Sequence, residues 1–185
     1  ALARAFWANL RAGKSGIREV PPDRWDWRTA GAGVRWGGFL DGVDRFDPLF
    51  FGVSPAEAEA MDPHERLWVE ECWTALEDAG YPPARLAAAV GTPAGNPVGV
   101  FAGVMNPTYQ WVAAGAAAAG HPTAATRSYW SVANRVSYLF DFHGPSLAVD
   151  TACSSSLAAI HLACEALRRG ECKVALAGGV NLILH

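Results

Sequence analysis

The sequence predicts an α/β protein, in which helices pack against a sheet. The apolar run 146–149 enters a turn, a helical pattern follows, and a second apolar run lies at 174–177, which is the order of a βαβ unit. Residues 98–104 form a short apolar run spaced by glycine, as is typical of a buried central strand. A longer amphipathic pattern between 63 and 79 predicts a helix that covers such a sheet.

The first segment predicts a helix followed by a long loop. Apolar residues recur at helical spacing, and a glycine ends the pattern: Leu2, Phe6, Leu10 and Gly13. Residues 14–45 contain several glycines and a proline pair, so we expect them to form a loop. The loop tryptophans Trp25, Trp27 and Trp36 could stack on a sugar or a nucleobase, but tryptophans in loops more often pack against a core.

Two helix starts follow with the same residue order. Residues 54–57 read Ser-Pro-Ala-Glu and residues 62–65 read Asp-Pro-His-Glu, which places a capping side chain, a proline and a glutamate where helix N-termini favour them. We expect His64 to lie in the exposed first turn of the second helix. Four carboxylates are expected on the solvated side of this helix, since helical spacing alone does not supply a converging acid–base pair: Glu70, Glu71, Glu77 and Asp78.

The middle of the chain is less regular. Residues 82–97 are rich in alanine, proline and glycine and are predicted to be a linker. The small-residue run 113–120 is compatible with a loosely packed helix or with a flexible loop. An amphipathic pattern from 123 to 141 predicts a helix that ends before Gly144.

Composition and charge exclude several classes of protein. Hydrophobic residues make up 51% of the chain and charged residues 18%, which indicates a globular fold. The net charge of −3, without a basic run, argues against a nucleic-acid partner, and no stretch approaches the ~20 apolar residues of a membrane span. No signal peptide is recognisable, and the four cysteines show no metal-ligand spacing with the five histidines. We therefore expect a cytoplasmic protein that binds no metal.

The most informative position is Cys153, which follows the predicted strand 146–149 and precedes the predicted helix. Backbone N–H groups and the positive end of a helix dipole favour a thiolate at such a position. Small neighbours at 152 and 154–156 leave room for a substrate carbonyl and for its oxyanion. A buried structural cysteine would fit the same pattern. The pattern alone leaves both interpretations open.

The run 149–157, Val-Asp-Thr-Ala-Cys-Ser-Ser-Ser-Leu, resembles the active-site motif of β-ketoacyl synthases, in particular the ketosynthase domains of modular polyketide synthases. Segments 46–55, 61–63, 75–80 and 133–138 resemble the same family in the same order. The resemblance covers nearly the whole chain. Details at 103–105, 109–110, 151–153 and 159–161 look most like the type that is served by separate acyltransferases.

The resemblance implies a function for Cys153. In this family the matching cysteine accepts an acyl chain from the phosphopantetheine arm of an acyl carrier protein, and a malonyl-type extender then loses carbon dioxide and attacks the acyl group. It also implies that residues 105–111 line the acyl pocket near a homodimer interface, so Met105 and Tyr109 are candidate substrate-binding residues. No cofactor is expected to bind the chain directly.

The family's two catalytic histidines lie well downstream of the cysteine. His161 stands eight residues along the same helix, roughly 10 Å or more away at 1.5 Å per residue, and is expected to be a core histidine. Neither His185 nor the loop histidines His121 and His143 matches the family's histidine motifs. The two catalytic histidines are therefore expected outside this chain, and 1–185 alone is expected to give weak acyl transfer at best and no condensation.

The fold implied by the resemblance is thiolase-like, with αβαβα layers. Residues 1–185 correspond to the N-terminal half of a ketosynthase domain without its first strand, so we expect exposed apolar surface where a second half would pack. One alternative is a condensing enzyme of fatty-acid synthesis, which the tryptophan-containing loop and the segment 61–63 disfavour. Another is a non-catalytic half-domain for dimerisation or carrier docking, which a cysteine at 153 disfavours.

Overall fold

A computed structural model of the chain describes residues 2–29, 35–106, 108–120 and 128–184. Residues up to Asp41 form one unit and Gly42–Leu184 a second, larger one. The expectations for His121, His185 and the first residues of the predicted helix 123–141 lie outside the described residues.

The smaller unit contains a helix and a short hairpin. Helix α1 spans Leu2–Arg11, as predicted, and strands β1 (Ile17–Glu19) and β2 (Trp36–Gly38) pair antiparallel. Residues 14–45 are therefore not all loop, because this hairpin interrupts them. Trp36 is exposed rather than packed in a core, and the guanidinium of Arg35 lies over the Trp27 ring, 4.9 Å from its centroid.

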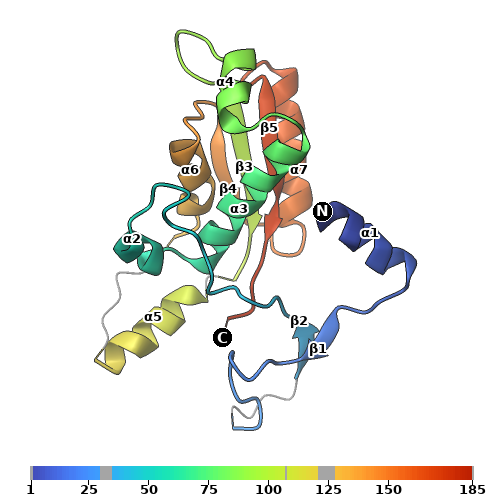
Figure 1. Ribbon diagram of the computed structural model, residues 1–185, viewed down its shortest axis with the longest axis vertical. Helices are drawn as coiled ribbons and strands as arrows, with labels where there is room; N and C mark the ends of the chain where they lie inside the picture. Colours follow the sequence, from blue (N-terminus) through green and yellow to red (C-terminus); the bar gives the residue numbers. More distant parts are fainter. Residues whose placement is uncertain (1, 30–34, 107, 121–127, 185) are drawn as a thin grey trace. The chain divides into compact units, whose positions relative to one another are not determined.

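The larger unit is built on a parallel sheet of three strands in the order β4-β3-β5 (Figure 1). The central strand β3 spans Val98–Val104, with β4 (Ser146–Val149) and β5 (Val174–Val180) on either side. Both runs that the sequence assigns to strands 98–104 and 146–149 are confirmed, and the third strand continues three residues beyond the predicted run. Because β3 separates β4 from β5, the predicted βαβ unit skips over the central strand.

Six helices accompany this sheet in the described residues: α2 (Pro55–Ala60), α3 (Pro63–Asp78), α4 (Pro83–Val90), α5 (Tyr109–Ala118), α6 (Trp130–Leu139) and α7 (Ser155–Arg168). The Ser54 hydroxyl accepts the Glu57 N–H at 3.2 Å and a carboxylate oxygen of Asp62 accepts the His64 N–H at 2.9 Å, so both predicted caps are confirmed. The linker prediction for 82–97 is wrong where α4 forms, since alanines favour a helix once a proline occupies its first position. Residues 113–118 belong to helix α5.

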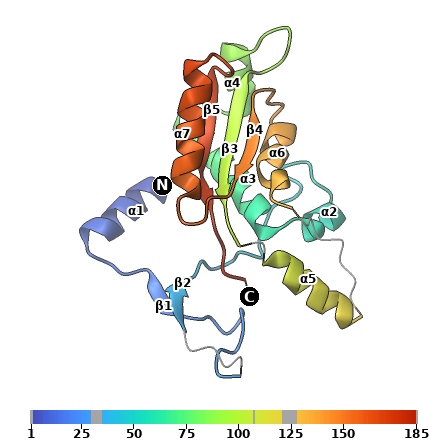
Figure 2. The ribbon, with the colours of Figure 1, turned by 180° about the vertical axis from the view of Figure 1, so that it is seen from behind.

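The two faces of the sheet carry different helices (Figures 1 and 2). Helices α3 and α6 cover one face, where the larger apolar cluster gathers side chains from both helices and from β3. Helix α7 covers the other face, where a smaller cluster joins Phe101 to the helix residues Ala159, Ala163 and Ala166. The sheet is thus the middle layer of a three-layer arrangement.

Two expectations about histidines are wrong. His64 is fully buried although it lies in the first turn of α3, because the N-terminus of this helix meets the chain that follows β5. His161 is exposed and is not a core histidine, because α7 turns its alanines and not its larger side chains toward the sheet. Three of the four α3 carboxylates, Glu71, Glu77 and Asp78, are exposed as expected, and Glu70 is partly buried.

Candidate active site

Cys153 lies in the turn that joins β4 to α7, two residues before the helix begins, and it is exposed. The preceding residue, Ala152, has φ of 54°, a left-handed conformation that residues with a Cβ rarely adopt. The Ala152 N–H donates to a carboxylate oxygen of Asp150 at 3.0 Å, which holds the backbone in this sharp turn. The turn places Cys153 beside the positive end of the helix.

The Ser155 side chain stabilises the same turn through two hydrogen bonds. Its hydroxyl accepts the Thr151 N–H at 2.9 Å and donates to the Ala152 carbonyl at 2.7 Å, so it closes the loop around Cys153. Ser155 is buried, whereas Ser154 is exposed and donates to the Thr151 carbonyl at 2.8 Å. The three consecutive serines therefore differ in role, and sequence reasoning treated them only as small neighbours.

Two glycines let the start of α7 approach the sheet. A Cβ at Gly103, near the end of β3, would lie 2.6 Å from the backbone nitrogen of Ser156. A Cβ at Gly179, near the end of β5, would lie 2.8 Å from the Ser156 Cβ. Both separations are shorter than a Cβ tolerates, so only glycine lets the helix N-terminus sit on the carboxyl ends of these strands.

These elements enclose an open pocket of about 220 Å³. Its lining comes from the ends of β3 and β5, the turn and the start of α7: Gly103, Val104, Met105, Ala152, Cys153, Ser155, Ser156, Gly179, Val180 and Asn181. Cys153 and Met105, two of the three predicted site residues, therefore share one pocket. The wall formed by 179–181 was missed, although the glycine pair at the end of the third predicted strand is a signal for close backbone approach.

Tyr109 does not line this pocket. It is the first residue of α5, and its hydroxyl donates to the Glu59 carbonyl at 3.0 Å. Burial raises the pKa of Tyr109, which keeps the phenol protonated and able to donate.

No histidine within the described residues lines the Cys153 pocket. His143 lies before β4, at the opposite end of that strand from Cys153, and its ring bonds a carboxylate oxygen of Asp141 at 2.8 Å. This hydrogen bond raises the pKa of His143. Over the described part of the chain, no group of three or more histidine, cysteine or acidic side chains could hold a metal ion. The same residues contain no helix that is long and apolar enough to cross a membrane.

A second, larger open pocket of about 490 Å³ lies between α2 and α6, and Cys153 is not part of it. Its charged groups are Glu57 and Arg135, which form an ion pair with each other. The lining of this larger pocket contains no cysteine, so the smaller pocket around Cys153 is the candidate active site.

The comparisons with known proteins agree with this geometry. Residues 2–185 match the family model described as β-ketoacyl synthase, N-terminal domain. The chain is 54% identical to polyketide synthase PksL of Bacillus subtilis over 188 residues, and 52% identical to polyketide synthase ThaG of Burkholderia thailandensis over 190 residues. These alignments cover 97% and 98% of this chain but only 4% and 3% of the two relatives.

Solved structures give the same result. The oxazolomycin ketosynthase domain OzmH KS7 of Streptomyces albus JA3453 superposes with a TM-score of 0.86 at 48% identity, over 97% of this chain and 32% of that one. The ketosynthase from module 6 of the bacillaene synthase of Bacillus subtilis 168 superposes with a TM-score of 0.84 at 37% identity, over 98% of this chain and 29% of that one. The predicted thiolase-like fold is confirmed. An exposed thiol at a sharp strand–helix turn, a glycine-lined pocket around it and these similarities lead to one conclusion: the chain belongs to the β-ketoacyl synthase family.

Proposed function

We propose that Cys153 is the acyl-accepting nucleophile of a ketosynthase domain of a modular polyketide synthase. The observation that carries the proposal is that this exposed thiol stands in a pocket where the N-terminus of α7 meets the carboxyl ends of β3 and β5. The Cys153 thiolate attacks the thioester carbonyl of an acyl group on the phosphopantetheine arm of an acyl carrier protein. The bond from that carbonyl to the sulfur of the arm breaks, the arm leaves as its thiolate, and the acyl group stays on Cys153.

The second half-reaction is decarboxylative Claisen condensation. A malonyl-type extender on a carrier protein loses carbon dioxide, and the resulting enolate attacks the acyl group on Cys153 and displaces the thiolate. Since the chain spans 29–32% of the solved ketosynthases it matches, we assign 1–185 to the N-terminal portion of the domain and the two catalytic histidines to another part of it. Residues 1–185 alone are then expected to accept an acyl group slowly and not to condense it.

Met105 and Tyr109 are the proposed contacts for the acyl chain. Met105 follows β3 directly and shares the pocket with Cys153, so its flexible side chain is placed to border the first carbons of the chain. Tyr109 lies four residues further on and would contact the far end of a longer acyl chain. It would do so with its ring, because its hydroxyl is already bonded to the Glu59 carbonyl.

The proposed partners follow from this chemistry. Substrates arrive on the phosphopantetheine of an acyl carrier protein, which the domain contacts without binding a cofactor of its own. A homodimer of the full domain and a cytoplasmic location complete the proposal, which includes neither a nucleic acid nor a membrane. A net charge of −3 supports the exclusion of a nucleic-acid partner.

Acylation by a simple thioester tests the nucleophile. The folded chain is incubated with an acyl N-acetylcysteamine thioester, and the mass of the intact protein is followed with time. We expect one acyl group per chain, which is lost in Cys153→Ser and retained in the matched control Cys164→Ser, because Cys164 is an exposed thiol outside the pocket. Acylation that persists in Cys153→Ser, or a folded chain that never reacts, would overturn the proposal and favour a non-catalytic module.

A further inference from the structure

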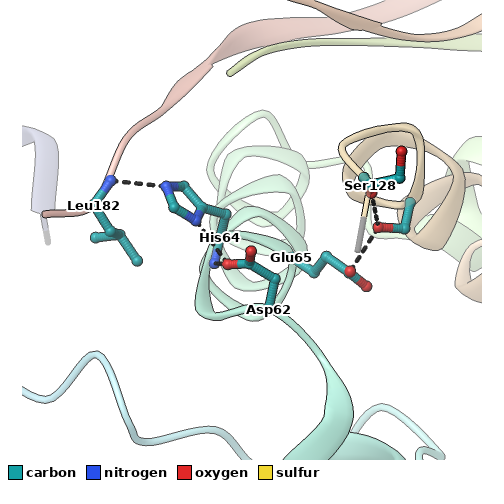
Figure 3. A network of polar contacts seen from close by, with 6 residues as sticks. Asp62, His64, Glu65, Ser128 and Leu182 are labelled. Carbon is teal, nitrogen blue, oxygen red and sulfur yellow. Dashed lines mark hydrogen bonds and ion pairs between the residues drawn. The ribbon is translucent and has the colours of Figure 1, made fainter. Parts of the chain in front are cut away.

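A buried histidine joins helix α3 to the segment that forms one wall of the Cys153 pocket. His64 is fully buried, and its Nε2 lies 2.9 Å from the backbone nitrogen of Leu182 (Figure 3). Its other ring nitrogen, Nδ1, lies 2.7 Å from a carboxylate oxygen of Asp62. The two contacts place one imidazole between the cap of α3 and the chain after β5.

The hydrogen bonds define the state of this ring. Because the Leu182 N–H donates to Nε2, that nitrogen carries a lone pair and Nδ1 carries the proton, which it donates to Asp62. The same oxygen of Asp62 also accepts the backbone N–H of His64 at 2.9 Å. Asp62 therefore holds the start of the helix and the orientation of the ring together, so His64 is a rigid acceptor aimed at one amide.

The Leu182 amide lies directly after the wall of the Cys153 pocket. The pairing of β5 with β3 ends at Val180, opposite Val104, so the chain beyond that residue is outside the ladder of the sheet. Val180 and Asn181 line the pocket around Cys153, and Leu182 is the next residue. The bond from His64 thus fixes the backbone directly after the pocket wall, from a residue 118 positions earlier in the chain.

We propose that His64 is a positioning residue for the Cys153 site: by accepting the Leu182 N–H it holds the 180–181 wall at its distance from the thiol. The assignment of an acyl group as the occupant of the pocket rests on the proposed function. The placement of the wall does not. Without an acceptor at 64, the wall segment moves away from the sheet and the access to Cys153 changes.

Two amide substitutions separate this role from a general contribution to folding. In His64→Gln the side-chain oxygen extends as far as Nε2 and accepts the Leu182 N–H. In His64→Asn the shorter amide still donates to Asp62 and does not extend to Leu182. Both remove the ring and leave a buried amide of similar polarity, and they differ in the bond that they keep: His64→Gln keeps the bond to Leu182, and His64→Asn keeps the bond to Asp62. Glu65→Gln serves as a control for disturbance of the same helix turn, since Glu65 is also buried and accepts the Ser131 hydroxyl at 2.6 Å.

The readouts are amide hydrogen exchange of Leu182 and alkylation of Cys153 by a small reagent, iodoacetamide, and a bulky one, a pyrene maleimide. We expect His64→Asn to raise the exchange rate by about tenfold, the effect of one lost buried hydrogen bond, and to change the ratio of bulky to small alkylation at Cys153. His64→Gln and Glu65→Gln are expected to keep both values within about twofold of the unsubstituted chain, well below the effect of that lost bond. Protection of the buried Cys72 thiol verifies that each variant is folded.

If folded His64→Asn and His64→Gln show the same Leu182 exchange rate and the same Cys153 alkylation ratio, the positioning role is overturned. So does a Cys153 alkylation ratio that changes as much in Glu65→Gln as in His64→Asn. If His64→Asn loses the protection of Cys72, the exchange of Leu182 in His64→Gln decides: wild-type exchange supports the proposal and raised exchange refutes it. Alkylation requires no acyl transfer, so a chain that fails to take an acyl group rejects the proposed function while this test of His64 still gives its own answer.

Discussion

The two faces of the central strand β3 carry side chains of different size. On the face covered by α3 and α6, β3 presents Val98, Val100, Ala102 and Val104 to the larger apolar cluster. On the face covered by α7, it presents Gly99, Phe101 and Gly103. A parallel strand alternates its side chains between two faces, so one run of seven residues carries both patterns.

The helices match the faces that they cover. Helix α3 buries large side chains, among them Trp68 and Leu76, whereas α7 buries alanines and turns its larger apolar residues outward: Leu157, Ile160, Leu162 and Leu167. Leu157 is 70% exposed. One face is stabilised by the volume it fills. The α7 face depends on close approach between the helix and the strands, so that the start of α7 contacts the ends of β3 and β5 beside Cys153.

The largest expected effect is the loss of volume on the α3 face. Leu76→Ala should lower the free energy of unfolding by about 2–5 kcal/mol, because a buried leucine leaves a cavity that its neighbours only partly fill. Leu157→Ala on α7 should change it by less than about 0.5 kcal/mol, since that side chain is mostly exposed. Urea unfolding of both variants measures the difference. A similar loss at both leucines would contradict the contrast between the two helices.

The next effect is the gain of volume on the α7 face. Gly103→Ala should cost about 1–3 kcal/mol, because the new Cβ meets backbone atoms of Ser155 and Ser156 that have little room to move. Gly178→Ala is the matched control on the α3 face, where the nearest atom is on the Trp68 ring at 3.3 Å. Thermal unfolding compares the two variants. If Gly178→Ala is the more harmful one, the approach of α7 to the sheet is not the tighter of the two.

A pH series reports on the buried thiol of the α3 face. Burial raises the pKa of Cys72, so the folded state retains a proton that the unfolded state releases above the ordinary thiol pKa of about 8.5. The stability from Cys72 is complete below that pH and falls as pH rises further, by at most about 1.4 kcal/mol per pH unit. Unfolding free energies between pH 7 and 10 should show this slope, which Cys72→Ala reduces and the exposed control Cys164→Ala retains. An unchanged slope in Cys72→Ala would assign it to other groups.

The smallest effect concerns the turn before α7. Ser155→Ala should lower the free energy of unfolding by about 1 kcal/mol, because it removes the hydroxyl that bonds the Thr151 N–H and the Ala152 carbonyl. The neighbouring control Ser154→Ala should cost less than about 0.5 kcal/mol, because its hydroxyl is exposed. Chemical unfolding distinguishes them. Equal losses would show that burial of Ser155 does not matter.

Local signals in the sequence were sufficient for most elements. The strands at 98–104 and 146–149 and the capped starts of α2 and α3 follow from apolar runs, glycine and proline, whose effects act within a few residues. The position of Cys153 between a strand and a helix follows from the same signals. Helix α4 was missed because alanine next to proline and glycine is as typical of a linker as of a short helix.

Burial was the weak point of prediction. Helical spacing in the sequence places Leu157, Ile160 and Leu167 on one apolar stripe of α7, yet these side chains are exposed and the alanines of the helix face the sheet. The same error reversed the two histidines, since His161 follows the exposed side of α7 and His64 meets a segment 118 residues away. No local pattern reports a contact of that separation.

The sequence by itself determined most of the strands and helices, where Cys153 falls between them and, by resemblance, to which family the chain belongs, because these depend on neighbouring residues and on motif order. The tertiary structure decided which side of each helix is buried, that Gly103 and Gly179 admit the start of α7, and that His64 bonds the segment after β5. Those outcomes depend on surfaces from distant parts of the chain, which acquire their neighbours only when the layers pack.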